Sequence, residues 1–207
     1  LSPYHLEGGC DIVCQIGTAK YGMRDDNGLL SDDKLKEKAA YKQVRMFEIK
    51  LSQGAKPGKG GMLPGAKVTA EIGAIRGIPE GVASISPNRH VEVDSADDLL
   101  DMVSHIREVT GKPVGFKLVL GSTAWLDEFC QRVVARGLEQ APDFITLDSS
   151  DGGTGAAPMP LMDSVGLPLR ESLPILVDKL VKYGLRERVR VIASGKCINP
   201  TDVAAAL

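Results

Sequence analysis

The chain has 207 residues, 43% of them hydrophobic, and a formal net charge of −2 with both signs interspersed. This length predicts one domain, residues 1–207, with one buried core. The balanced charge argues against nucleic acid as a partner, and no apolar run reaches membrane-spanning length. Four scattered cysteines without a C-x-x-C pair suggest no metal site and a reduced, cytoplasmic setting. Both ends of the chain look cut, because it begins with Leu1 and stops inside a helix-like run.

Strand-like and helix-like segments alternate along the chain. Short, nearly continuous apolar runs predict strands at 10–16, 44–50, 82–85, 114–120, 143–147 and 189–193. Helices are expected at 31–40, 69–75, 95–109, 124–136 and 169–183, and from 202 onward. Ser31 and Ser95 precede acidic first turns as N-caps, and Gly77 follows a helix end. This alternation predicts a parallel sheet covered on both faces.

Two α/β architectures satisfy that pattern, a (β/α)8 barrel and a doubly wound open sheet. An open sheet gathers ligand contacts at one crevice, whereas a barrel draws one from the carboxyl end of each strand. Functional-looking side chains follow nearly every predicted strand, at Thr18, Lys50, Ser86, Lys117, Asp148 with Asp151, and Ser194. We therefore expect an incomplete TIM barrel with about six strands, the first and last being missing.

The stretch 46–64 joins a β-like run carrying Glu48 and Lys50 to a glycine-rich loop with two further lysines. Lys117 lies within a second apolar strand. A single strand lysine can simply reach solvent at the strand's edge. Two such lysines on independent strands favour an anionic or electron-rich ligand.

Two more loops follow predicted strand ends. The segment 148–158 has two carboxylates and several glycines, which make either a plain turn or a close approach to a flat ligand. Ser194-Gly195-Lys196 suits a phosphate, although a turn is the more frequent explanation. His90 could face the site, whereas the spacing suggests no partner for the other two histidines. The serines at 149 and 150 lack the G-x-S-x-G elbow of hydrolases.

The residues Glu48 to Gly61, with Leu63-Pro64-Gly65, resemble the FMN-binding synthase domain of glutamate synthase, of the large-subunit type. The resemblance extends along most of the chain. Glu7-Gly8-Gly9 and the segments 15–22, 85–87, 116–119 and 151–156 occur in the family's order. The family fold is a (β/α)8 barrel that carries FMN.

The resemblance implies a flavin-dependent oxidoreductase in glutamate biosynthesis. Reduced FMN would transfer a hydride to a 2-imino or 2-oxo acid, in the family 2-iminoglutarate formed from 2-oxoglutarate and ammonia. Lys117 would lie beside the N1–C2=O edge of the flavin, and Lys50 and Lys117 would be catalytic. The implied substrate contacts are Glu7, Lys50, Arg76 and Ser95. The implied cofactor contacts are Thr18, Lys117, Asp151, Gly152, Gly153, Thr154, Ser194, Gly195 and Lys196.

The sequence departs from the family at several points. Met62 stands where glutamate synthase has a glutamine that reaches the oxo acid, and Thr18-Ala19-Lys20 stands where it has serine-glycine-arginine. In these respects the chain resembles the stand-alone relatives of the synthase domain. The cysteines that hold the family's 3Fe–4S cluster are not in this chain. The resemblance also implies an electron-donor protein or subunit, either ferredoxin or one that oxidises NAD(P)H.

Two alternatives stay open from the residues alone. The first is a phosphate-binding barrel lyase or isomerase in which Lys50 or Lys117 forms a Schiff base. The second is a non-catalytic remnant or interaction domain, in which a partner covers the unpaired strand edges of an open barrel.

Overall fold

The computed structural model describes residues 1–151 and 157–207. Five parallel strands form the main sheet in the spatial order β1-β2-β5-β6-β7, and β3 and β4 form a separate antiparallel pair. The strands are β1 Ile12–Ile16, β2 Val44–Lys50, β3 Met62–Leu63, β4 Ser84–Ile85, β5 Val114–Leu118, β6 Phe144–Asp148 and β7 Arg190–Ser194. The main strands therefore follow one another in chain order, without the reversal of order that defines a doubly wound sheet.

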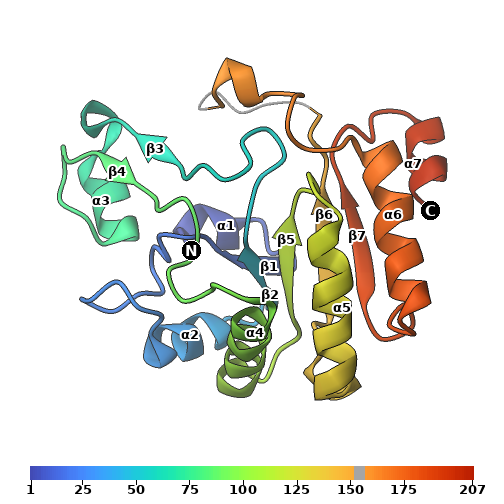
Figure 1. The fold of residues 1–207 in the computed structure, drawn as a ribbon. Coiled ribbons are helices and arrows are strands. Elements are labelled where there is room, and N and C mark those ends of the chain that lie inside the picture. The colour runs from blue at the N-terminus through green and yellow to red at the C-terminus, as the bar shows by residue number, and fades with distance from the viewer. Residues whose placement is uncertain (152–156) are drawn as a thin grey trace.

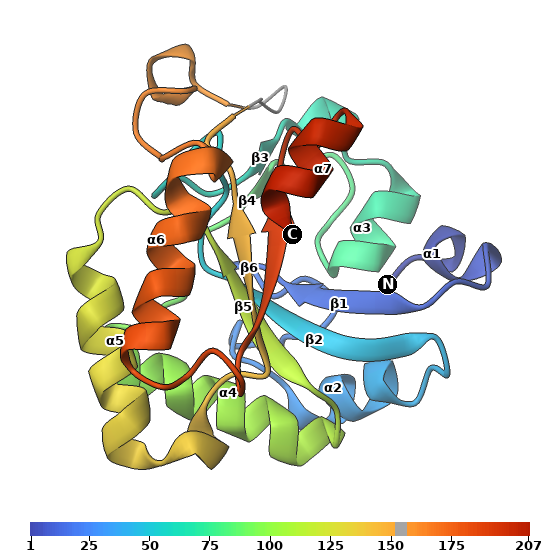
Figure 2. The same cartoon turned by 90° about the vertical axis from the view of Figure 1, so that its right-hand side faces the viewer.

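Helices α2, α4, α5 and α6 cover one face of this sheet (Figures 1 and 2). The helices in chain order are α1 Pro3–Glu7, α2 Asp32–Ala39, α3 Ala70–Arg76, α4 Ala96–Thr110, α5 Ala124–Arg136, α6 Leu169–Lys182 and α7 Pro200–Ala206. Short 3-10 turns lie at Gly65–Lys67, Leu138–Gln140 and Met159–Leu161. Neighbouring helices pack in the sequence α2, α4, α5, α6, which follows the order of the strands beneath them.

The two faces of the sheet differ in chemistry because successive strand residues point to opposite sides. One set of alternating residues is apolar and fully buried under the helices, as Phe47, Ile49 and Phe116 show. The other set is largely polar and includes Glu48 and Lys50 on β2. The expectation that helices cover both faces was wrong. A sequentially ordered parallel sheet with helices outside and polar side chains inside is part of a (β/α)8 barrel.

The predicted buried strand at 82–85 was also wrong. Only Ser84–Ile85 is extended, and it pairs with Met62–Leu63 outside the main sheet. Val82 is 50% exposed and Ile85 is 66% exposed, so the run is not part of the core. Periodicity cannot separate so short an apolar run in an exposed antiparallel pair from a buried strand.

The other elements lie within a few residues of their predicted positions, because their end signals are local. The Ser31 and Ser95 side chains accept hydrogen bonds from the first turns of α2 and α4. Gly77 closes α3 in the left-handed conformation, with φ of 66°. Within the described residues, no helix is long and apolar enough to cross a membrane.

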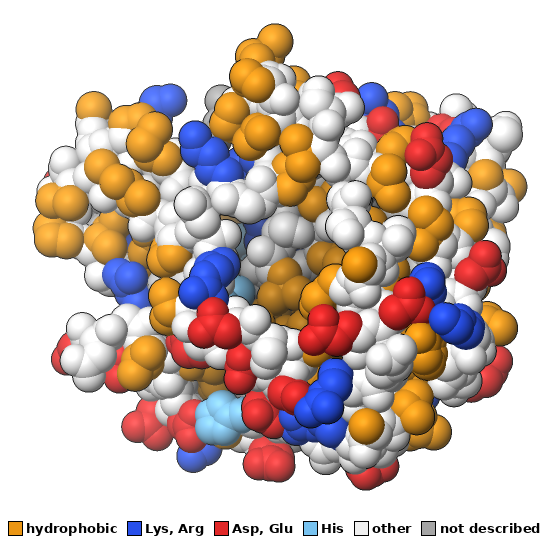
Figure 3. Space-filling view, viewed as in Figure 1, with side chains coloured by type: hydrophobic (Ala, Val, Ile, Leu, Met, Phe, Trp, Pro, Cys, Tyr) orange, Lys and Arg blue, Asp and Glu red, His pale blue; other side chains and the backbone are white. Residues whose placement is uncertain are grey.

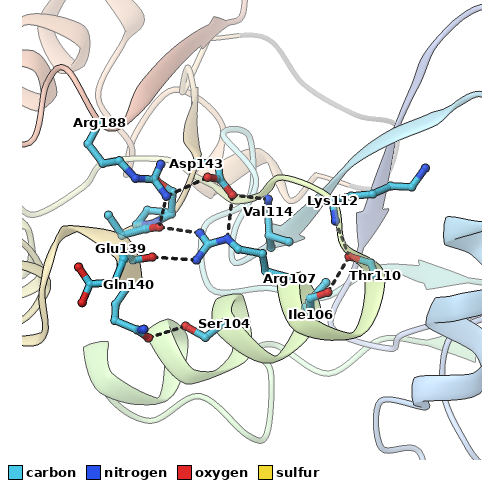
Figure 4. A network of polar contacts seen from close by, with 12 residues as sticks. Ser104, Ile106, Arg107, Thr110, Lys112, Val114, Glu139, Gln140, Asp143 and Arg188 are labelled. Atoms are coloured by element: carbon cyan, nitrogen blue, oxygen red, sulfur yellow. Dashed lines mark hydrogen bonds and ion pairs between the residues drawn. The ribbon is translucent and has the colours of Figure 1, made fainter.

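A polar network ties together the segments that lead into β5, β6 and β7 (Figure 4). The Asp143 carboxylate accepts hydrogen bonds from Arg107 Nε at 3.0 Å, from Arg188 Nη2 at 2.9 Å and from the Val114 backbone N–H at 2.8 Å. These contacts join three consecutive barrel units at the amino edge of the sheet. In barrels this edge supports stability, whereas the carboxyl edge carries the chemistry.

Candidate functional site

Lys50 and Lys117 lie opposite each other at the carboxyl ends of β2 and β5. The Lys50 ammonium donates a hydrogen bond to Gln53 Oε1 at 3.2 Å. Lys117 Nζ lies 3.8 Å from Asp148 Oδ2, on the next strand. The two lysines that were predicted from independent strands thus converge on the polar face of the sheet.

A third lysine joins them from the glycine-rich loop. Lys56 is 6% exposed, and it lines the same cavity as Lys50. Burial lowers the pKa of Lys50, and the charges of Lys117 and Lys56 lower it further, against smaller opposing effects of nearby carboxylates. Sequence reasoning did not single out Lys56, because a lysine in a loop of glycines and prolines usually lies in solvent.

The cavity has a volume of about 230 Å³ and opens at the carboxyl ends of β1 and β2. Its lining contains lysines, glycines and neutral polar residues, and no carboxylate side chain. Thr18 is part of this lining and donates a hydrogen bond to the Pro87 carbonyl at 2.7 Å. Figure 3 shows a hollow on this face, between the lobe of α3, β3 and β4 and the helix-covered body. The composition of the lining suits an anionic group.

The loop glycines permit close approach between backbone segments. A Cβ atom on Gly54 would lie 1.6 Å from the Ser149 carbonyl oxygen, and one on Gly60 would lie 2.0 Å from that of Ser86. The Gly54 backbone N–H also donates to Asp148 Oδ2 at 2.9 Å. The loop is therefore seated against the end of β6, where Asp148 connects it to Lys117.

Beneath the lysines lies a polar layer around a buried carboxylate. The Glu48 carboxylate is 6% exposed and accepts hydrogen bonds from Gln15 Nε2 at 2.6 Å and from Thr146 Oγ1 at 2.5 Å. These three residues come from β1, β2 and β6. They fix the spacing of the strands whose ends carry the site.

The ends of β6 and β7 also come together. Ser194 Oγ lies 3.5 Å from Asp148 Oδ1, and Lys196 Nζ lies 3.9 Å from Asp151 Oδ1. Gly195 has φ of 119° and Lys196 has φ of 44°. Gly152, Gly153 and Thr154 were predicted to line the same region, and they lie outside the described residues.

Three predicted substrate contacts lie apart from the lysines. Glu7 is exposed at the end of α1, which is held by Gln43 at the amino end of β2. Ser95 is exposed and forms a capping box at the start of α4. Arg76 Nη1 donates to Ser84 Oγ at 2.8 Å, and its guanidinium lies over the Tyr21 ring. Within 1–151 and 157–207, none of the three forms a hydrogen bond or ion pair with Lys50 or Lys117.

The remaining candidates are internal. His90 is 1% exposed, and its Nε2 lies 3.0 Å from the Lys50 carbonyl oxygen, beneath the cavity. Cys14 and Cys130 are buried free thiols. Within the described residues, no group of His, Cys, Asp and Glu side chains is arranged to hold a metal ion.

Comparison with known proteins extends over the whole chain. Residues 1–207 match a family model described as the conserved region in glutamate synthase. The chain is 45% identical over 207 residues to the glutamate synthase large subunit-like protein YerD of Bacillus subtilis (strain 168), covering 100% of this chain and 39% of the relative. It is 36% identical over 199 residues to the archaeal glutamate synthase [NADPH] of Methanocaldococcus jannaschii, covering 95% of this chain and 35% of the relative.

A third relative comes from a plant. The chain is 38% identical over 162 residues to the ferredoxin-dependent glutamate synthase 2, chloroplastic, of Arabidopsis thaliana, covering 77% of this chain and 10% of the relative. The chain therefore spans less than two fifths of the length of each of these relatives. Because the family model matches from the first residue to the last, we conclude that the chain belongs to the glutamate synthase family.

Proposed function

We propose that this chain is the flavin-binding part of a glutamate synthase-type oxidoreductase that acts on a 2-oxo or 2-imino acid. The observation that carries the proposal is the convergence of Lys50, Lys56 and Lys117 at the carboxyl edge of a barrel sheet, in a member of this family. Lys50 and Lys56 line a cavity without carboxylate side chains, and Lys117 lies opposite Lys50 on the neighbouring strand. This concentration of positive charge suits a ligand that is anionic or becomes anionic on reduction.

The donor set fits FMN. Lys117 would hold positive charge beside the N1–C2=O edge of the flavin, where negative charge accumulates on reduction. Asp148, at 3.8 Å, would keep the Lys117 ammonium oriented. Thr18, Asp151, the glycines at 152 and 153 and Thr154 would line the ring system, and Ser194, Gly195 and Lys196 would begin the phosphate site. Bound FMN would supply the hydride that reduces the substrate.

The substrate carboxylate would bind Lys50 and Lys56. Both line the cavity, and Gln53 Oε1 accepts a hydrogen bond from Lys50 that directs its ammonium. Burial keeps competing water from these ammonium groups, which strengthens a charge-assisted hydrogen bond. Glu7, Arg76 and Ser95 remain proposed contacts, and reaching the same ligand would require their segments to move.

Met62 bears on which acid is bound. Its side chain is 63% exposed on β3, opposite Ile85. An apolar side chain therefore stands on the surface where the family resemblance leads us to expect a glutamine. We propose that 2-oxo acids with a less polar side chain compete with 2-oxoglutarate in this chain. The archaeal relative is named for NADPH and the plant relative for ferredoxin, and we propose one of these two as the electron donor here.

An absorption spectrum of the full-length protein tests the cofactor. The proposal predicts a flavin band that is released as FMN on denaturation, and loss of that band on reduction. The lowered pKa of Lys50 would also suit a Schiff-base amine. A colourless protein in which borohydride traps an oxo-acid adduct on Lys50 or Lys117 would replace the flavin proposal with lyase or isomerase chemistry.

A further inference from the structure

His90 makes an unusual pair of contacts for a loop residue. It belongs to the segment between β4 and α4 and is 1% exposed. One ring nitrogen, Nε2, lies 3.0 Å from the backbone oxygen of Lys50. The other, Nδ1, is buried, and it has no hydrogen-bond partner among the residues that the structure describes.

These contacts assign the proton on the ring. The Lys50 carbonyl can only accept, so Nε2 must carry the hydrogen and donate it. Nδ1 then carries a lone pair. A side chain that only filled the space between loops would be apolar and would leave no unpaired polar atom. The arrangement therefore keeps a donor for Lys50 while leaving an acceptor unpaired.

The Lys50 carbonyl has no paired donor on β1, because β1 ends one residue earlier, although β5 still pairs with Lys50 on the other side. The β1–β2 register ends at Ile16 opposite Ile49, one residue before Lys50. Beyond that point the ladder between these two strands no longer holds the backbone of β2. His90 contacts the first carbonyl past the end of this ladder.

An ion pair tethers the segment that carries His90. Lys20, which is 3% exposed, lies 2.8 Å from the partly exposed Glu92 through Nζ and Oε1. Glu92 is two residues from His90, and Lys20 is two residues from Thr18 on the loop after β1. The pair thus connects the His90 segment to the loop that follows β1.

We infer that His90 is a positioning residue, which fixes the backbone of Lys50 so that its ammonium points into the cavity beside Lys56 and Lys117. This inference rests on the proposed function for its catalytic consequence, and on geometry alone for the position of Lys50. The Lys50 side chain extends from this backbone, so a displaced carbonyl would move the ammonium away from Lys56 and Lys117.

Two amide variants separate positioning from packing. In H90Q the side-chain amide nitrogen can take the place of Nε2 and donate to Lys50. In H90N the amide is one methylene shorter and falls short of that carbonyl. H90L removes the donor and keeps most of the volume. H105Q is a matched control, because His105 lies on α4 and contacts Asp32 at the surface.

Two readouts are needed. The first is kcat for oxo-acid reduction by the flavin-loaded, full-length protein. The second is the titration of Lys50, measured by trace acetylation across pH and mass spectrometry, with exposed Lys42 as the internal reference. We expect H90Q and H105Q to match wild type. In H90N and H90L, Lys50 should titrate closer to Lys42, and kcat should fall about tenfold or more, because small misplacements of catalytic groups are costly.

Equal Lys50 titration and equal kcat in H90Q and H90N would overturn the inference. A packing role alone would lower the melting temperature of H90N and leave Lys50 titration unchanged. If H90L does not fold, the two amide variants still decide. If wild type itself shows no flavin turnover, the proposed function fails, and the Lys50 titration then tests the positioning role independently.

Discussion

Replacing Gly54 by alanine perturbs the site without touching a charged group. The new Cβ would lie 1.6 Å from the Ser149 carbonyl oxygen and 2.7 Å from its carbon. Real Cβ contacts do not come below 3.0 Å, so the loop or the end of β6 must move by at least 1.4 Å. Gly54 does not have positive φ, so alanine meets a steric clash there and no backbone strain.

The displacement has two expected consequences. Overpacking of this kind typically costs about 1–3 kcal/mol of stability. The movement also breaks the hydrogen bond from the Gly54 N–H to Asp148, which is the direct link between the loop and the partner of Lys117. Since a misplacement of about 1 Å can cost on the order of 100-fold in rate, we expect flavin-dependent turnover to fall by about that factor.

Urea denaturation and steady-state turnover of G54A test this reasoning, with G61A as the matched variant for stability. A Cβ on Gly61 would meet only the Ser86 Oγ at 3.7 Å, which is ordinary contact, and Gly61 also lacks positive φ. We expect G61A to stay within about 0.5 kcal/mol of wild type. Equal stability and turnover in the two variants would show that the loop is not seated as described.

Three further predictions concern single groups. K117A should slow flavin reduction by more than it weakens FMN binding, measured by stopped-flow absorbance and fluorescence titration, and unchanged reduction kinetics would contradict the role of Lys117. E48A should lose about 2 kcal/mol in urea denaturation, because the buried Thr146 hydroxyl loses its acceptor, whereas exposed Gln15 can turn to water; a loss below about 0.5 kcal/mol would mean that Thr146 finds another partner. Burial lowers the pKa of His90 from its ordinary 6.5. As the pH falls, the unfolded chain therefore takes up a proton at this ring before the native protein does, which favours unfolding. The stability contribution of His90 should be complete above pH 6.5 and decline as the pH falls through the lower native value, and H90Q should remove this decline from the pH profile of unfolding.

The helices and the five main strands could be predicted because their signals are local. Ser31 and Ser95 cap helices through residues three positions away, and Gly77 ends one by its own backbone conformation. The convergence of Lys50 and Lys117 could also be predicted, because the carboxyl ends of parallel strands share one edge.

The features that the sequence did not reveal depend on contacts between distant segments. Lys56 is buried only because its loop folds back over the strand ends. Gly54, in that loop, bonds to Asp148, 94 residues away. The bond from His90 to the Lys50 carbonyl spans 40 residues and involves no side-chain pattern on β2. The one-sided covering of the sheet likewise follows from how successive units pack, which apolar periodicity within one strand does not record.

In the proposed function, the lysines at the carboxyl edge of the sheet bring an anionic oxo or imino acid to FMN. The most direct test of this role is anaerobic reoxidation of the reduced full-length protein by 2-oxo acids with ammonium, in wild type and K50A. In wild type we expect the flavin band to return in a single turnover, with formation of the corresponding amino acid. In K50A the band should return far more slowly. A reduced flavin that no 2-oxo acid with ammonium reoxidises, or one that K50A reoxidises at the wild-type rate, would contradict this role.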